Sequence, residues 1–77
     1  MARKLTVHGI ELRPAWLGGY LGKIDGRFYR FALSKDGRRW EIRAPIFPGF
    51  GRKLDERDTL RDAVGAMLVA SGKEPGG

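Results

Sequence analysis

The sequence predicts an α+β fold in which an antiparallel meander of three to four strands packs against one C-terminal helix. Two observations indicate the sheet: Asp25-Gly26 and Asp36-Gly37 each lie between aromatic and apolar runs, and Asp-Gly readily adopts the positive φ angles of a two-residue type I′ hairpin loop. A third observation indicates the helix, because apolar residues near the end of the chain recur with helical spacing. The 77 residues form a single domain, 1–77, with a thin core.

The first part of the chain predicts short strands joined by turns. Residues 1–16 contain one short strand, or two very short strands kinked at Gly9, and a connection that begins at Pro14. Residues 17–44 form a three-stranded meander. We expect its glycine-rich first strand, 17–24, at an edge of the sheet, because glycine weakens a strand interior.

The second and third strands of the meander, 27–34 and 38–44, alternate apolar and polar residues. One face of the predicted sheet is therefore apolar and needs a cover. The predicted helix, 58–71, provides it through Leu60, Ala63, Val64, Met67 and Leu68. Asp58 or Thr59 is the expected N-cap. Gly72 marks the end of the helix, and residues 72–77 form a flexible tail.

A long connection, 45–57, is predicted between the sheet and the helix. Connections of about a dozen residues are commonly functional or disordered. This one carries Phe47, Phe50, Arg52 and Lys53 among Pro and Gly residues, so we expect its side chains to contribute to ligand contact.

Positive charge is concentrated in the first two thirds of the chain. The formal net charge is +6, with 12 Lys and Arg against 4 Asp and Glu in residues 1–53, and 3 against 5 in residues 54–77. Such a distribution attracts nucleic acid, an anionic protein or an acidic membrane. The alternative is an ordinary solvated surface of a basic protein.

The residue types argue against catalysis. The chain has one His, no Cys and two Ser, too few to assemble a nucleophile, a base and an orienting group, or a metal site. We therefore expect a non-enzyme with no cofactor, no metal and no small-molecule substrate, and we expect His8 to be a structural or solvent-facing residue. The lack of Cys favours the cytoplasm, and polar residues that interrupt the first apolar run predict neither a signal peptide nor a membrane span.

The polar face of the predicted sheet is the first candidate site. Arginine forks bind phosphates, and exposed aromatic rings stack on bases; Phe28 and Tyr20 are the rings expected there. The candidate nucleic-acid-binding residues are Arg30, Arg39, Arg43, Arg38, Lys23, Arg52 and Lys53. Alternatively, Glu41 neutralises Arg30 or Arg43 across the strands, because the solvated face of an antiparallel sheet is normally polar.

The outer side of the helix is the second candidate site, because it carries small uncharged residues where a surface helix normally carries Lys and Glu. A partner protein or a second copy in a homodimer would pack against it. The candidate partner-binding residues are Phe28, Phe47, Phe50, Gly65, Ala66 and Val69. Alternatively, the N-terminal segment or the loop covers this stripe.

Two short runs, Ala44-Pro-Ile-Phe-Pro-Gly-Phe50 and Asp58-Thr-Leu-Arg-Asp-Ala-Val64, resemble the strand-end turn and the helix start of HicB-type antitoxin domains. The resemblance implies a unit of three strands and one helix that binds and blocks a small RNase toxin. The order of elements is also similar to the arm-type DNA-binding domain of tyrosine recombinases, whose sheet enters the major groove.

Together these features predict a small basic non-catalytic binding protein, a regulator from a phage or another mobile element, that contacts nucleic acid through its basic sheet face. The alternative is an inhibitor of a partner protein. That inhibitor would be antitoxin-like, or would block a nucleic-acid-processing or defence complex of the host in the manner of an anti-CRISPR protein.

Overall fold

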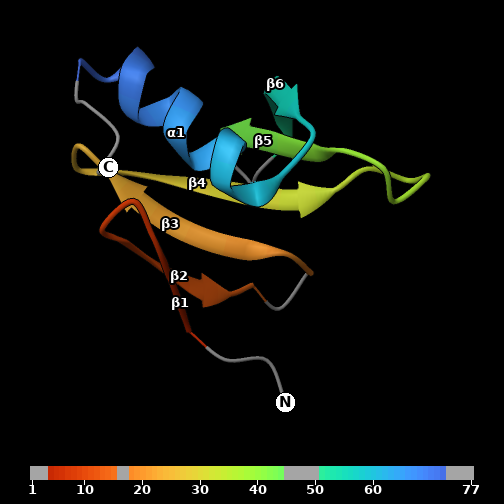
Figure 1. The fold of residues 1–77 in the computed structure, drawn as a ribbon, viewed down its shortest axis with the longest axis horizontal. Coiled ribbons are helices and arrows are strands. Elements are labelled where there is room, and N and C mark those ends of the chain that lie inside the picture. Colours follow the sequence, from red (N-terminus) through yellow and green to blue (C-terminus); the bar gives the residue numbers. More distant parts are fainter. Residues whose placement is uncertain (1–3, 16–17, 45–50, 73–77) are drawn as a thin grey trace.

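The computed structural model describes residues 4–15, 18–44 and 51–72. It contains a six-stranded antiparallel sheet with strand order β1-β2-β3-β4-β5-β6, followed by one helix (Figure 1). The elements are β1 (Leu5–Val7), β2 (Ile10–Pro14), β3 (Tyr20–Ile24), β4 (Arg27–Leu33), β5 (Trp40–Ala44), β6 (Arg52–Arg57) and α1 (Leu60–Ala70). The predicted α+β class is confirmed. The predicted number of strands is wrong, because the sheet has six strands and not three or four.

The N-terminal segment forms two strands, β1 and β2, that pair with each other as a hairpin. His8 and Gly9 connect them with φ angles of 51° and 78°, and Val7 lies opposite Ile10. Positive φ at both central residues is the requirement of a type I′ turn, and His is among the residues that tolerate it better than most. The kink expected at Gly9 is therefore a turn.

Strand β6 was not expected, because residues 52–57 were predicted to belong to a loop. Residues of β6 pair with β5, for example Asp55 with Ile42 and Glu56 with Glu41. Its sequence is mostly charged, which is unusual for a strand interior but suits an edge strand, where charges discourage pairing with other chains. Residues 45–50 of the predicted loop and 73–77 of the predicted tail lie outside the described residues.

The two Asp-Gly turns differ. Asp25 and Gly26 have φ angles of 54° and 79°, so the two-residue loop predicted there is confirmed. At the second turn only Gly37 has a positive φ, and the backbone N–H of Ser34 donates to the carbonyl of Arg39. The loop thus spans residues 35–38, and the predicted two-residue loop is wrong. The carboxylate of Asp36 instead accepts hydrogen bonds from the Ser34 hydroxyl and from the backbone N–H of Arg38.

Strand β3 lies inside the sheet, between β2 and β4, and not at the predicted edge. Gly22 of this strand provides space for a neighbouring side chain instead of weakening the strand. Gly22 is buried opposite Leu12, and a Cβ atom added at Gly22 would lie 2.5 Å from Cδ2 of that leucine. The missing side chain lets Leu12, which is fully buried, fill the core at this point.

The core lies between the sheet and α1. Its largest fully buried side chains are Phe31, Leu12, Ile24, Ile42 and Val64. Helix α1 packs mainly on β4, β5 and β6 (Figure 1). The helix begins after Thr59, whose hydroxyl accepts a hydrogen bond from the backbone N–H of Asp62 at 3.0 Å, and this confirms one of the two predicted N-caps. It leads into Gly72, which has a φ of 79°.

Candidate nucleic-acid interface

The face of the sheet turned away from α1, here called the outer face, carries the candidate site. Its residues alternate along the strands with those buried against the helix, and cross-strand pairing carries the alternation from β2 to β6. The outer face consists of Glu11, Arg13, Leu21, Lys23, Phe28, Arg30, Ala32, Glu41, Arg43, Lys53 and Glu56.

Strand register aligns four cations across the sheet. Arg13 lies opposite Leu21, which lies opposite Arg30; Arg30 lies opposite Arg43, and Arg43 opposite Lys53. This set of five residues, here called the cationic row, crosses five strands and spans about 19 Å at the usual strand spacing. Like charges directly opposite each other are destabilising. An anionic chain lying along the row would relieve that repulsion.

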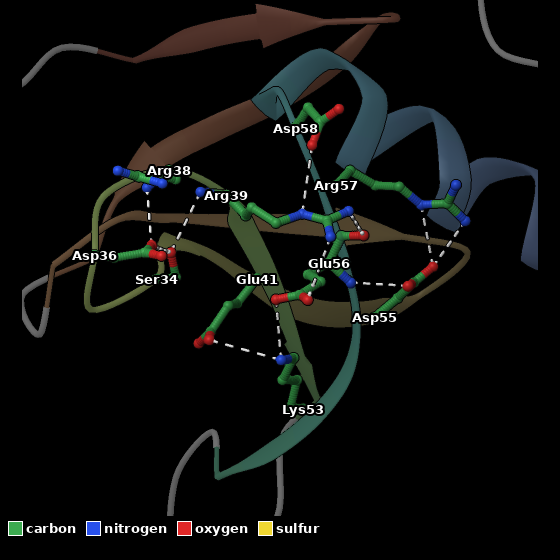
Figure 2. A network of polar contacts seen from close by, with 10 residues as sticks. All are labelled: Ser34, Asp36, Arg38, Arg39, Glu41, Lys53, Asp55, Glu56, Arg57 and Asp58. Atoms are coloured by element: carbon green, nitrogen blue, oxygen red, sulfur yellow. Dashed lines mark hydrogen bonds and ion pairs between the residues drawn. The ribbon is translucent and has the colours of Figure 1, made fainter.

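The β5–β6 end of the cationic row is largely neutralised by carboxylates. Arg43 donates to Oε1 of Glu41 at 2.7 Å and to the carbonyl of Gly51 at 3.0 Å, and its side chain is 29% exposed. Lys53 lies 3.0 Å from Oε2 of Glu56 and 3.9 Å from Oε2 of Glu41 (Figure 2). Glu41 does pair with Arg43, but within β5 and not across strands as expected; its cross-strand contact is with Lys53. Ligand contact at this end would require these ion pairs to open.

The β2–β4 end of the row is more open. Arg13 has a side chain that is 72% exposed, and its Nε lies 3.1 Å from Oε1 of Glu11. The hydrogen bond from Arg13, with a smaller contribution from Lys4, lowers the pKa of Glu11. Arg30 donates from Nε to the carbonyl of Gly18 at 3.0 Å. Arg13 is exposed and pairs with an exposed carboxylate, whereas Arg30 is partly buried, so Arg13 is the more accessible of the two cations.

An exposed aromatic ring lies beside this open end. Phe28 is 47% exposed and lies opposite Lys23, whose Nζ is 5.6 Å from the centre of the ring. A shallow hollow in the outer face is lined by Glu11, Arg13, Leu21, Lys23 and Phe28. The outer face therefore offers a flat apolar ring and several cations within one surface, as predicted for Lys23 and Phe28.

The two predicted arginines of the β4–β5 loop have different surroundings. Arg39 is 3.5 Å from a carboxylate oxygen of Glu56 and 3.4 Å from one of Asp58, so it connects the start of β5 to the segment that precedes α1 (Figure 2). Arg38 lies in the exposed loop, and its backbone N–H binds Asp36 at 3.0 Å. The Ser34 hydroxyl, together with this N–H, lowers the pKa of Asp36.

Several predicted site residues lie elsewhere. Tyr20 packs on the core side of the sheet, 6.4 Å from the ring of Trp40, so its expected place on the polar face is wrong. Arg52 is exposed but lies opposite Ala44, which the alternation puts on the helix side. Phe47 and Phe50 are outside the described residues.

The small-residue stripe of α1 is not an open surface. Gly65 is buried and Ala66 is partly buried against the core, so less of the stripe is exposed than expected. Val69 is 63% exposed. These three residues line a hollow together with His8, so the tip of the β1–β2 hairpin lies beside the stripe. The alternative in which the N-terminal segment covers part of the stripe fits this arrangement.

Arg13 is the member of the cationic row that sequence analysis missed. The sequence did indicate its position on the polar face, because Arg13 follows the apolar Leu12 in a strand whose residues alternate. The pairing of β2 with β3 was the missing information, since only that register aligns Arg13 with Leu21 and Arg30.

Comparison with protein-family models, curated proteins and solved structures gives no match. Within residues 4–15, 18–44 and 51–72, no helix has the length and apolar character needed to span a membrane. Over the same ranges, no group of three His, Asp or Glu side chains is arranged to hold a metal ion.

Proposed function

We propose that this chain is a small non-catalytic cytoplasmic protein that binds nucleic acid through the outer face of its sheet. The cationic row carries the proposal: four cations lie in register across five strands, on the face that α1 leaves open. Phosphate groups supply most of the affinity of non-specific nucleic-acid binding, through release of their counterions.

The shape of the row favours a nucleic acid over other anions. A small anion would engage one or two of these side chains, whereas a chain with regularly repeated charges can follow all four over about 19 Å. Phe28 adds a ring on which a base can stack, beside Lys23. An acidic protein or membrane would gain less from that ring.

Salt-dependent binding tests the proposal. Fluorescence anisotropy with a labelled oligonucleotide should show a slope of log K against log salt of about −3 for four phosphate contacts, or about fiftyfold weaker binding at 200 mM than at 50 mM salt. The variants Arg13→Gln and Arg30→Gln should each weaken binding and reduce the slope by about one.

Arg61→Gln is the matched control, because it removes the same charge from the exposed surface of α1, away from the outer face. It should leave both affinity and slope nearly unchanged. Binding that is independent of salt would contradict the proposal, and so would an Arg61→Gln variant as impaired as Arg13→Gln.

A second candidate function, inhibition of a partner protein, is favoured by the exposure of Val69 beside the hairpin tip at His8. The burial of Gly65 reduces the surface available there. A complex that survives nuclease treatment and is lost in Val69→Lys, but not in Arg13→Gln, would support this function instead.

A further inference from the structure

We infer that the ligand of the outer face is a single strand, which crosses the sheet with one base stacked on Phe28. This inference rests on the proposed function and narrows it to a class of nucleic acid. It follows from the width of the sheet, from the exposure of one aromatic ring, and from the distance between that ring and the cationic row.

The width of the sheet excludes insertion of its face into the major groove of an undistorted duplex. Six strands at the usual spacing form a face about 24 Å across. The major groove of B-DNA is about 12 Å wide and admits a helix or a two-stranded ribbon. An undistorted duplex could therefore touch the outer face only with its phosphate edge, and its stacked bases would stay out of reach of Phe28. In this respect the chain differs from the arm-type domains that its order of elements resembles.

The position of Phe28 suits a nucleotide whose phosphate lies on the cationic row. Phe28 and Arg30 are two residues apart on the same face of β4, which separates them by about 7 Å. This separation is similar to the reach of one nucleotide from its base to its phosphate. Lys23 faces Phe28 from β3, with its ammonium near the ring, and adds a cation beside the stacked base.

Phe28 presents an exposed ring on the outer face, with the ammonium of Lys23 near it. The ring is 47% exposed on a face whose other members are mostly charged, and a buried position would have contributed more to stability. An unstacked base can cover this ring, because stacking on an aromatic side chain is favourable and tolerant of base identity. A paired base in a duplex cannot.

The test compares single-stranded and double-stranded oligonucleotides of one sequence and length, at one salt concentration, by fluorescence anisotropy. The single strand should bind at least tenfold more tightly. Phe28→Ala should weaken single-strand binding about tenfold and leave duplex binding unchanged, while Phe28→Trp should retain the affinity of the original chain.

Val69→Ala is the matched control, because Val69 is an exposed apolar residue, 63% exposed, on α1 and away from the outer face. It should not change binding. Thermal unfolding by circular dichroism should show that Phe28→Ala stays folded, as expected for an exposed side chain.

The outcomes separate the two claims. If Phe28→Ala binds the single strand as well as the original chain does, while Arg13→Gln and Arg30→Gln still weaken binding, the single-strand inference is overturned and the proposed function stands. Duplex binding as tight as single-strand binding would also overturn the single-strand inference and leave the proposed function standing. If neither oligonucleotide binds in a salt-dependent way, both claims fail.

Discussion

Single glycines decide where β3 can lie. Gly19 has a φ of 74°, and a Cβ atom at this position would collide with the backbone carbonyl of Phe31 and would lie 2.8 Å from Cβ of Ala32. Gly22 leaves space for Leu12 in the core. Both positions permit neighbouring strands to approach closely, and they place a glycine-rich strand in the middle of the sheet.

The variant Gly19→Ala should lower the free energy of unfolding by about 2–4 kcal/mol, because it combines an unfavourable φ with overpacking against backbone. Gly26→Ala is the control, since Gly26 has a similar φ of 79° but no atom within 4 Å of the added Cβ. It should lower the free energy of unfolding by only about 1 kcal/mol. Urea unfolding of both variants measures the difference, and equal losses would show that the close approach at Gly19 is not present.

The carboxylate of Asp55 makes stability depend on pH. It accepts a hydrogen bond from the backbone N–H of Glu56 at 2.8 Å and lies 2.8 Å from Nη2 of Arg57, and these contacts lower its pKa from 3.8 in that order of importance (Figure 2). A lowered pKa in the folded state stabilises the protein above pH 3.8. That contribution is lost as the pH falls through the folded-state value.

The variant Asp55→Asn should therefore have a lower Tm than the original chain at pH 7. The difference in Tm should shrink as the pH falls below 3.8, because the original carboxylate becomes protonated. Thermal unfolding followed between pH 7 and pH 2.5 measures it. A difference in Tm that is constant over this range would contradict the assignment.

Sequence reasoning at the residue scale succeeded where one local interaction decides the structure. Asp25-Gly26 forms the expected turn, and within residues 4–15, 18–44 and 51–72 no hydrogen bond or ion pair engages the Asp25 carboxylate. Asp36-Gly37 differs because Ser34 and Arg38 donate to the carboxylate of Asp36. With these hydrogen bonds Asp36 does not adopt a positive φ, and the loop is longer than two residues.

At the scale of elements, α1 was predictable because its apolar period and its cap agree. The predicted range, 58–71, exceeds the observed helix, Leu60–Ala70, by its flanking residues. Strand β6 was not predictable from its sequence, since its charged residues have no alternation of apolar side chains. It forms because β5 offers an unpaired edge, which is a property of the assembled sheet.

The N-cap of α1 can be tested directly. Thr59→Ala should lower the free energy of unfolding by about 1 kcal/mol, because the backbone N–H of Asp62 would lose its acceptor. Thr59→Ser keeps an oxygen at the same place and should retain most of that stability. Chemical unfolding monitored by far-ultraviolet circular dichroism distinguishes the two variants, and an equal loss in both would show that the hydroxyl does not cap the helix.

At the scale of the molecule, the fold separates a buried side from a charged side. Helix α1 packs on one face of the sheet, and strand register gathers Arg13, Arg30, Arg43 and Lys53 on the other. Sequence analysis found Arg30 and Arg43 from their alternation along single strands, and Lys53 as a cation of the predicted loop. The fourth, and the alignment of all four into one row, depend on which strands are neighbours, and no single strand contains that information.

The most direct measurement is an NMR titration of the isotope-labelled protein with a short single-stranded oligonucleotide. The account predicts saturable shifts that are largest for the backbone amides of Arg13, Lys23, Phe28 and Arg30 and small along α1. Shifts that centre on Ala66 and Val69 of α1, or shifts that do not saturate, would contradict binding at the outer face.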